Sequence, residues 1–137
     1  SLLDEKQVKV VSQLDDVPIV SDERALQFMF TQIIVNAVNY ANEKNARYIS
    51  LKTGFDSVQN RYYVKICDNG VGVLHSDLPF IFDKGFTGNH AKRKQSTGMG
   101  LYLVKKLCDE LHIEIEVESM VGQGFAIQLL FPIIDVN

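Results

Sequence analysis

Four polar residues recur at helical spacing inside a stretch that is otherwise apolar. They are Gln32, Asn36, Asn39 and Tyr40, and their spacing places all four on one face of a helix. Amide groups beside a hydrophobic core need hydrogen-bond partners, because burying them unpaired is costly. Two interpretations stay open: the face is simply exposed to solvent, or it forms the polar wall of a pocket. In a pocket, the amide oxygen of Asn36 would be a hard ligand of the kind that Mg²⁺ accepts beside phosphate oxygens and water.

A second candidate follows a strand-like run and reads Asp68-Asn69-Gly70-Val71-Gly72. An Asp-Asn-Gly sequence is most often only a turn. As part of a site, the Asp68 carboxylate at the strand tip would accept a hydrogen bond from the exocyclic amine of adenine. Gly70 and Gly72 would then let the backbone approach the flat ring closely.

A pair of glycines opens a later helical run, within the segment STGMGL at residues 96–101. Glycines at a helix start leave backbone N–H groups accessible at the positive end of the helix dipole, which favours a bound anion. The sequence has no GxxxxGK[ST] P-loop, and no third glycine completes a GxGxxG pattern. The segment therefore predicts an anion-binding helix start that belongs to neither of those classes.

An aromatic and then basic segment lies between the two glycine motifs. Phe80, Phe82 and Phe86 form either a small satellite core or an anchor for the loop that follows. That loop, at residues 85–97, is long for a compact domain, which favours a functional role. Its basic run at residues 92–94 would then be placed to reach phosphates, although a charge run is usually only a solvated face.

The elements that must position these groups follow from the hydrophobic periodicity. Strands are predicted at residues 7–13, 17–20, 47–55, 61–67, 113–119 and 124–134, and helices at residues 21–42 and from Gly98 to about residue 111. Ser21 is the predicted N-cap of the first helix. Hairpin-joined strands in this order predict an α/β two-layer sandwich rather than a parallel βαβ sheet.

Composition restricts the class of protein. The chain has 137 residues, 46% of them hydrophobic and 23% charged, which fits a single globular domain over residues 1–137. Its net charge of −3 does not favour a nucleic-acid or anionic membrane surface. Cys67 and Cys108 lack zinc-site spacing, so we expect two buried free thiols.

The four motifs occur in one order, and in that order the chain resembles the ATP-binding domains shared by gyrase, Hsp90, MutL and histidine kinases. The matching segments are NAVNY (36–40), DNGVG (68–72), FIFDKGF (80–86) and STGMGLYLVKKL (96–107), and the resemblance spans about residues 7–132. The last two segments look like histidine kinases in particular, and the last is similar to kinases that sense antimicrobial peptides. The resemblance implies a Bergerat-type ATP-binding fold, with a mixed, mostly antiparallel sheet and helices on one face, that binds ATP and Mg²⁺.

Position by position, the resemblance implies roles for the motif residues. Asn36 would hold the Mg²⁺ that bridges the phosphates, Tyr40 would pack beside adenine, and Asp68 would bond its amine. Residues 85–97 would form a lid over the nucleotide. The implied nucleotide-binding residues are Gln32, Asn36, Asn39, Tyr40, Asp68, Gly70, Gly72, Phe82, Lys84, Arg93, Lys94, Thr97, Gly98, Met99, Gly100 and Leu101; the metal ligands are Asn36 and Gln32; and the catalytic residues are Asn36 and Lys94.

Three positions depart from the family pattern. Asn39 stands where histidine kinases usually carry a basic residue, so Arg93 or Lys94 would have to supply that phosphate contact. Gln32 stands where an asparagine is usual, and it offers its amide oxygen on a longer arm. Phe125 replaces a threonine that is often found after the last glycine turn.

Gln32 also bears on the reaction. The resemblance implies a glutamate at this position in related ATPases and serine kinases, where it is the general base for water or a serine hydroxyl. A glutamine cannot accept that proton, whereas a neutral imidazole already carries a lone pair. Gln32 therefore favours phosphoryl transfer to histidine, achieved by positioning, magnesium and cationic side chains.

None of the three histidines, His75, His90 and His112, has the helical setting with a following acid that a phosphoacceptor needs. We therefore expect the catalytic part of a two-component sensor kinase, which phosphorylates a histidine on a dimerisation domain outside this chain. The parent would be a membrane homodimer with this domain in the cytoplasm and a response regulator downstream. The domain itself would contact neither nucleic acid nor the membrane. The rival interpretations are a related ATPase or serine kinase, and a nucleotide-binding module without catalysis.

Overall fold

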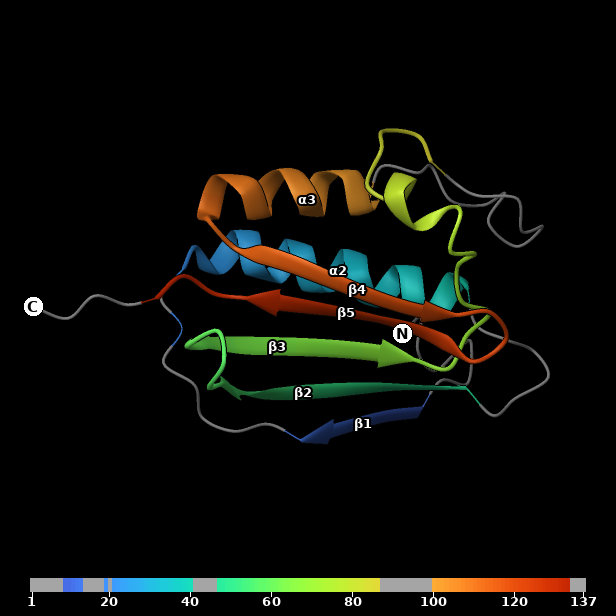
Figure 1. Cartoon of the computed structure of the whole chain (residues 1–137), viewed down its shortest axis with the longest axis horizontal. Coiled ribbons are helices and arrows are strands. Elements are labelled where there is room, and N and C mark those ends of the chain that lie inside the picture. The colour runs from blue at the N-terminus through green and yellow to red at the C-terminus, as the bar shows by residue number, and fades with distance from the viewer. Residues whose placement is uncertain (1–8, 14–18, 20, 41–46, 87–99, 134–137) are drawn as a thin grey trace, which may run out of the picture.

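The computed structural model describes residues 9–13, 19, 21–40, 47–86 and 100–133. In this part of the chain five strands form one sheet in the order β1-β2-β3-β5-β4 (Figure 1). The strands are β1 (Lys9–Gln13), β2 (Tyr48–Asp56), β3 (Arg61–Asp68), β4 (Glu114–Met120) and β5 (Gly124–Leu130). β1 runs parallel to β2, and the other neighbouring pairs are antiparallel. The predicted mixed, mostly antiparallel sheet is confirmed.

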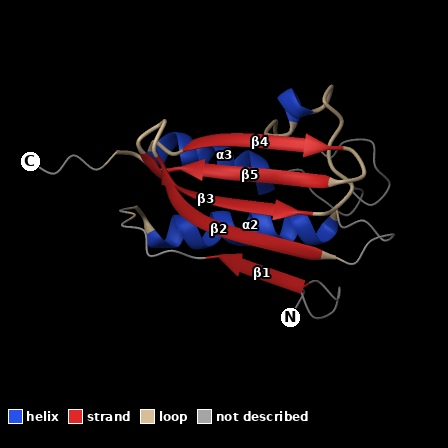
Figure 2. Cartoon of the chain, turned by 60° about the horizontal axis from the view of Figure 1, so that its bottom comes forward, coloured by secondary structure: helices blue, strands red, loops and turns tan. Residues whose placement is uncertain are grey.

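Two α-helices cover one face of this sheet. They are α2 (Glu23–Asn39) and α3 (Gly100–Leu111), and they lie side by side and antiparallel (Figures 1 and 2). A single 3₁₀ turn, η1 (Leu78–Phe80), follows the loop after β3. The predicted α/β two-layer sandwich is therefore confirmed. The second predicted strand, at residues 17–20, lies almost wholly outside the described residues.

α2 begins and ends slightly inside its predicted bounds. Asp22, not Ser21, is the N-cap, and its carboxylate accepts a hydrogen bond of 2.9 Å from the backbone N–H of Ala25. At the other end Tyr40 still donates its N–H to the carbonyl oxygen of Asn36, but its own carbonyl oxygen accepts the N–H of Val71. The helix therefore ends at Asn39, three residues before the predicted end, and Tyr40 leaves helical geometry with φ of −105° and ψ of 20°.

α3 ends in a left-handed residue. His112 has φ of 59°, and the N–H of Ile113 reaches back to the carbonyl oxygen of Cys108 at 2.8 Å, a common way to end a helix. This geometry turns the chain directly into β4. The predicted helix start at Gly98 lies outside the described residues.

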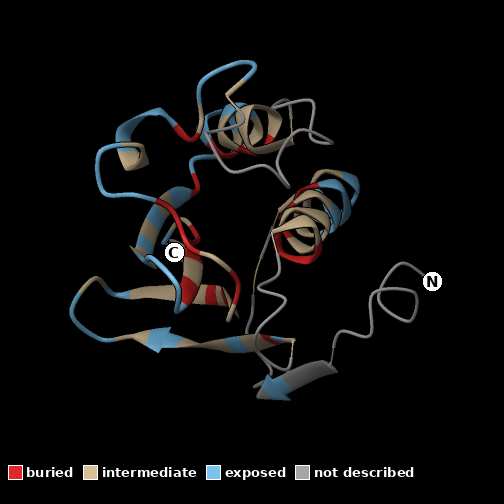
Figure 3. Cartoon of the chain, turned by 90° about the vertical axis from the view of Figure 1, so that its right-hand side faces the viewer, coloured by how far each residue is buried: buried red, intermediate tan, exposed pale blue. Residues whose placement is uncertain are grey.

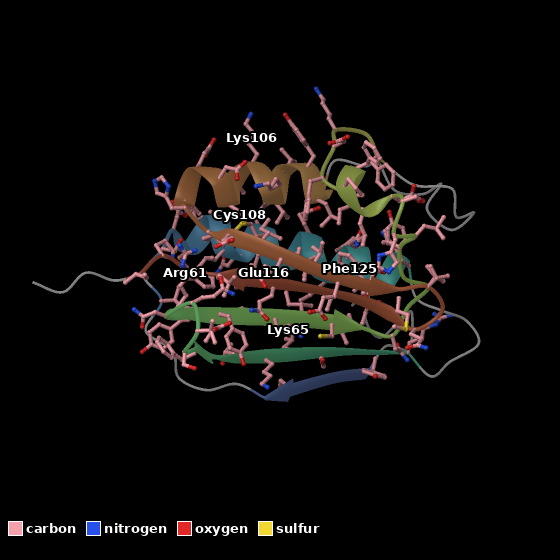
Figure 4. All side chains as sticks on the ribbon, viewed as in Figure 1. Arg61, Lys65, Lys106, Cys108, Glu116 and Phe125 are labelled. Atoms are coloured by element: carbon pink, nitrogen blue, oxygen red, sulfur yellow. The ribbon has the colours of Figure 1, made fainter. Side chains whose placement is uncertain are left out.

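The hydrophobic core fills the space between the sheet and the two helices (Figure 3). Its members include Met29, Ile33, Ile49, Ile66, Val104, Cys108, Ile127 and Leu129. The thiol of Cys108 lies 3.5 Å from the sulfur of Met29, which joins α3 to α2 (Figure 4). Burial raises the pKa of Cys108 to about 11, so this thiol stays protonated at neutral pH.

Among the described residues no helix covers the opposite face of the sheet, which carries polar side chains such as Lys52, Lys65 and Gln128. Cys67 lies there and is only half-buried, so the expectation of two buried thiols is wrong for this residue. The edge strand β4 exposes Glu114, Glu116 and Glu118, and Arg61 pairs with Glu114 at 3.1 Å. Charged side chains on an edge strand discourage pairing with other chains. Within the described residues, no helix is long and apolar enough to cross a membrane.

Candidate functional site

The sequence motifs meet at one end of the sheet. The end of α2, the end of β3, the tip of the β4–β5 hairpin and the start of α3 all lie at the right of Figure 1, the end that Figure 3 views. Val71, in the loop after β3, links two of these elements. Its N–H donates to the Tyr40 carbonyl oxygen at 3.0 Å, and its carbonyl oxygen accepts the N–H of Gly122 at 2.8 Å.

The polar face of α2 lies at the boundary between core and surface. Gln32, Asn36, Asn39 and Tyr40 are all half-buried, and the intervening Ala37 is buried. The predicted shared face is thus present, and it lies on the same helix as the core contacts. This position supports the pocket-wall interpretation over a purely solvated one, because a solvated face would be largely exposed.

The Asp68 loop is both a turn and a candidate site. The Asp68 carboxylate accepts the N–H of Gly70 at 2.8 Å, which closes a tight turn at the strand tip. The side chain of Asn69 accepts the backbone N–H of Tyr48 at 2.9 Å and ties the loop to β2. Sequence reasoning gave Asn69 no role, because a bond between residues 21 positions apart has no local signal.

Three glycines allow the loop to fit against its neighbours. A Cβ atom on Gly70 would collide with the carbonyl oxygen of Tyr40, one on Gly72 with that of Met120, and one on Gly124 with that of Asp68. Gly72 and Gly124 also have positive φ, of 74° and 141°. The close approach expected of Gly70 and Gly72 toward a ring is therefore, in this structure, an approach to protein carbonyl groups.

The start of α3 faces the polar side of α2. The carboxamide oxygen of Gln32 lies 2.9 Å from the point where a Cβ atom on Gly100 would stand. Leu101 packs against the core and holds the first turn of the helix in place. Backbone N–H groups in the first turn of an α-helix have no partner within the helix, so side chains, water or a ligand must supply one.

Only part of the aromatic segment at residues 80–86 packs into the interior of the protein. Ile81 is its buried residue, Phe82 packs against the core, and Phe80 is 52% exposed. The sequence left open a satellite core or an anchor for the loop; the structure shows Ile81 buried and Phe82 packed against the main core, with Phe80 largely exposed. Lys84 is exposed, and Gly85 turns the chain with φ of 81°.

Several predicted site residues cannot be placed by the structure. Arg93, Lys94, Thr97, Gly98 and Met99 lie outside the described residues, as do residues 87–97 of the predicted lid. Their roles stay predictions.

Phe125 lies directly opposite Asp68 across β3 and β5 (Figure 4 labels Phe125). Its half-buried ring packs against the core beside the site. The departure from the family's threonine at this position therefore puts an apolar wall next to the Asp68 carboxylate.

The oxygen donors of the site suit a metal ion that is also bound by the phosphates of a nucleotide. No three His, Cys, Asp or Glu side chains come together among the described residues. The available donors are instead the amide oxygens of Asn36 and Gln32. Mg²⁺ keeps several waters and usually takes one or two protein oxygens beside phosphate oxygens, so Asn36 could hold such an ion with little help.

Comparison with known families agrees with this geometry. Residues 21–134 match the family model described as "Histidine kinase-, DNA gyrase B-, and HSP90-like ATPase". The match spans most of the chain, so the chain belongs to this family, as the motifs predicted.

Within the family, the similar curated proteins are sensor kinases. The chain is 43% identical over 122 residues to Sensor protein BceS of Bacillus subtilis (strain 168), covering 88% of this chain and 35% of that protein. It is 36% identical over 123 residues to Sensor protein kinase GraS of Staphylococcus aureus (strain N315), covering 88% and 34%. The chain thus spans about a third of the length of these relatives.

Solved structures confirm the fold. The mycobacterial sensor histidine kinase MprB superposes with a TM-score of 0.83 at 15% identity, covering 96% of this chain and 88% of that one. The catalytic domain of histidine kinase ThkA gives a TM-score of 0.76 at 18% identity, covering 95% and 82%. The predicted fold class is therefore that of histidine kinase catalytic domains.

Proposed function

We propose that this chain binds ATP with Mg²⁺ and donates the γ-phosphoryl group to a histidine on a separate dimerisation domain of a two-component sensor kinase. The observation that carries this proposal is the meeting of α2, the Asp68 loop and the start of α3 at one end of the sheet. These elements offer amide oxygens, a carboxylate and the backbone N–H groups at the described start of α3. Such groups suit a metal ion, the amine of a base and phosphate oxygens respectively.

The roles divide along these chemical lines. Asp68 accepts the exocyclic amine of adenine, with Tyr40 beside the ring and Phe125 forming an apolar wall. Asn36 holds the Mg²⁺, which neutralises phosphate charge when bound. The first turn of α3 receives the phosphates, with further contacts from Lys84 and the basic residues of the loop before α3.

The polar face of α2 carries no carboxylate, and this favours phosphoryl transfer to histidine over hydrolysis. Gln32, Asn36, Asn39 and Tyr40 include no carboxylate, so this face offers no general base to activate water or a serine hydroxyl. An imidazole nitrogen needs none. It attacks the γ-phosphorus with its lone pair, the bond to the bridging oxygen breaks, and ADP leaves with that electron pair. The other ring nitrogen then releases its proton to solvent, which leaves a neutral phosphoimidazole.

The acceptor histidine is assigned to another domain for a structural reason. His75 lies in a loop, and His112 follows the last residue of α3. Both are exposed, and neither lies within a helix and precedes an acidic residue. His90 lies outside the described residues. The parent is proposed to be a homodimeric membrane sensor whose cytoplasmic part includes this domain and acts through a response regulator. Detection of antimicrobial peptides stays a prediction.

Transfer in trans tests the proposal. The chain is incubated with radiolabelled ATP, Mg²⁺ and a separately produced dimerisation domain that carries a phosphoacceptor histidine, and a variant of that domain with the histidine replaced by glutamine is the control. We expect acid-labile, alkali-stable label on the intact acceptor alone. Phosphate release by the chain alone would instead support an ATPase, and acid-stable phosphoserine would support a serine kinase. ATP binding without transfer would support a module without catalysis.

A further inference from the structure

The face of the sheet opposite the helices is hollowed over its central strands. The hollow has a volume of about 330 Å³, and the described residues that line it include Ser50, Lys52, Tyr63, Lys65, Cys67 and Gln128. These residues come from β2, β3 and β5, where they alternate with the residues that face the core. Sites for small molecules have volumes of roughly 300–1,000 Å³, so this hollow is large enough for a small ligand.

Two lysines lie directly opposite each other in the hollow. Lys52 of β2 pairs with Lys65 of β3, and Lys65 in turn lies opposite Gln128 of β5 (Figure 4 labels Lys65). Like charges at directly opposite positions of an antiparallel pair destabilise a sheet. The two lysines therefore create a local electrostatic cost that a bound anion would remove.

No carboxylate of the described residues neutralises this pair. Neither lysine makes an ion pair or a side-chain hydrogen bond within the described part of the chain. Two carboxylates of the edge strand β4 are engaged elsewhere: Glu114 pairs with Arg61 at 3.1 Å, and Glu116 accepts the side-chain amide of Gln59 at 2.9 Å. The positive charge of the hollow is thus uncompensated among the described residues.

The neutral polar side chains of the hollow are also hydrogen-bond donors. The hydroxyl groups of Ser50 and Tyr63 and the amide of Gln128 can each donate, and no described residue accepts a bond from them. The hydroxyl oxygen of Tyr63 lies 2.7 Å from the point where a Cβ atom on Gly54 would stand, so this group extends over β2. Among the described residues, the lining therefore combines two cations with donors and includes no carboxylate.

We propose that this hollow is a second ligand site, and that it binds a phosphate group of a small molecule. Two ammonium groups and several neutral donors suit an oxyanion that carries two or more negative charges. A small ligand fits better than an extended acidic peptide. Such a peptide would also cross β4, whose exposed side chains include Glu114, Glu116 and Glu118.

The second site does not depend on the proposed function, because none of its lining residues is assigned to ATP. Inorganic phosphates and the phosphate of a nucleotide share the chemistry that the hollow recognises. Pyrophosphate and AMP are therefore both used as probes. Pyrophosphate presents the anion alone, whereas AMP presents a phosphate attached to a nucleoside.

An NMR titration locates the site. Amide chemical shifts are followed as pyrophosphate replaces chloride at constant ionic strength without Mg²⁺, and a parallel titration uses AMP. Lys52→Gln and Lys65→Gln each remove one charge from the hollow. Lys106→Gln is the matched control, because it removes the same charge from an exposed position on α3, in the helix layer (Figure 4).

We expect pyrophosphate to shift the amides of residues 50–52, 63–65 and 128 in the wild type. Lys52→Gln and Lys65→Gln should each weaken binding about tenfold, and Lys106→Gln should bind as the wild type does. The same shifts with AMP would add nucleotide phosphates to the ligands of the site. Shifts with pyrophosphate alone would restrict the site to free phosphates.

Thermal denaturation separates lost binding from lost folding. Without the anion, the two hollow variants should be at least as stable as the wild type, because the repulsion between the lysines is removed. Pyrophosphate should raise the melting temperature of the wild type and of Lys106→Gln, but it should raise that of the hollow variants much less.

Three results would overturn the assignment. The first is an absence of pyrophosphate shifts in the hollow, and the second is equal binding by Lys65→Gln and wild type. The third is a response to a short polyglutamate peptide but not to pyrophosphate, which would assign the hollow to an acidic protein partner. Any of these results would leave ATP binding near Asp68 untouched, so failure here and failure of the proposed function are distinguishable.

Discussion

The backbone N–H of Val71 donates a hydrogen bond of 3.0 Å to the carbonyl oxygen of Tyr40. This bond joins the loop after β3 to the end of α2, two segments that are far apart in the sequence. Gly70 makes the bond possible, because a Cβ atom there would collide with the same carbonyl group. The carboxylate of Asp68 and the polar face of α2 are therefore held in a fixed relation.

Replacing Gly70 by alanine should break this junction. The added methyl group must displace backbone atoms of Tyr40, and we expect a loss of about 2 kcal/mol in the free energy of unfolding. Urea denaturation measures it. Gly122→Asn is the matched control: no atom lies within 4 Å of a Cβ there, and asparagine tolerates the positive φ of 79°. Equal stabilities of the two variants would contradict the steric argument.

Replacing Asp68 by asparagine should keep its role in the turn and remove its contact with adenine. The asparagine side-chain oxygen can still accept the N–H of Gly70, so stability should change by less than about 0.5 kcal/mol. The contact with adenine reverses polarity, so ATP affinity should fall between about tenfold and a hundredfold. Calorimetry with ATP and urea denaturation on the same samples provide both numbers. Unchanged ATP affinity would remove Asp68 from the adenine site.

Replacing Asn36 by alanine should affect metal-dependent binding only. Alanine is the best helix former, so α2 should persist. Adenosine affinity should change by less than about twofold, whereas the gain in ATP affinity on adding Mg²⁺ should shrink by about tenfold. Titration of adenosine and of ATP with and without Mg²⁺ separates the two effects. The same gain from Mg²⁺ in variant and wild type would exclude Asn36 as the metal-binding residue.

The two cysteines should react at very different rates. Cys108 is fully buried and its pKa is raised to about 11, whereas Cys67 is half-buried on the open face of the sheet. Because the thiolate is the reactive form, a thiol reagent at pH 8 should label Cys67 first and Cys108 only after unfolding. Mass spectrometry of a labelling time course checks this order. Early labelling of Cys108 would mean that α3 separates from α2 in the native state.

The raised pKa of Cys108 also predicts a pH dependence of stability. The folded state holds the proton up to about pH 11, while an unfolded thiol loses it near pH 9. Folded protein thus binds more protons in this window, so this contribution is complete below pH 9 and is lost as the pH rises to 11. The loss amounts to about 3 kcal/mol at most. Urea denaturation of wild type and Cys108→Ala at pH 8 and pH 10.5 should show a steeper decline in the wild type.

Sequence patterns predicted the elements well because each one carries its own local signal. The apolar spacing of α2 and the alternation along β3 gave both bounds to within a few residues. Element ends were predicted less accurately, and α2 ends at Asn39 instead of residue 42. The bond from the Val71 N–H to the Tyr40 carbonyl oxygen at this end has no local signal around Tyr40.

The sequence identified residues of the candidate site, but it did not predict the contacts that explain why each residue is there. Gly72 was expected to make room for a ligand, yet its close neighbour is the carbonyl group of Met120, nearly fifty residues later. Likewise, Gly100 was assigned to phosphate binding, and the structure adds the contact with Gln32. Such pairings depend on tertiary packing, so a single sequence contains no pattern that identifies them.

The central claim is that ATP binds at the end of the sheet where α2, the Asp68 loop and α3 meet. Amide chemical shifts recorded by NMR during titration with ATP and Mg²⁺ test it most directly. The account predicts that the largest changes fall on Asn36, residues 68–72 and the first turn of α3. A hollow of about 330 Å³ on the open face of the sheet, lined in part by Lys52, Lys65 and Gln128, is the alternative place for an anion. Shifts that cluster there, with none at Asp68, would contradict the account.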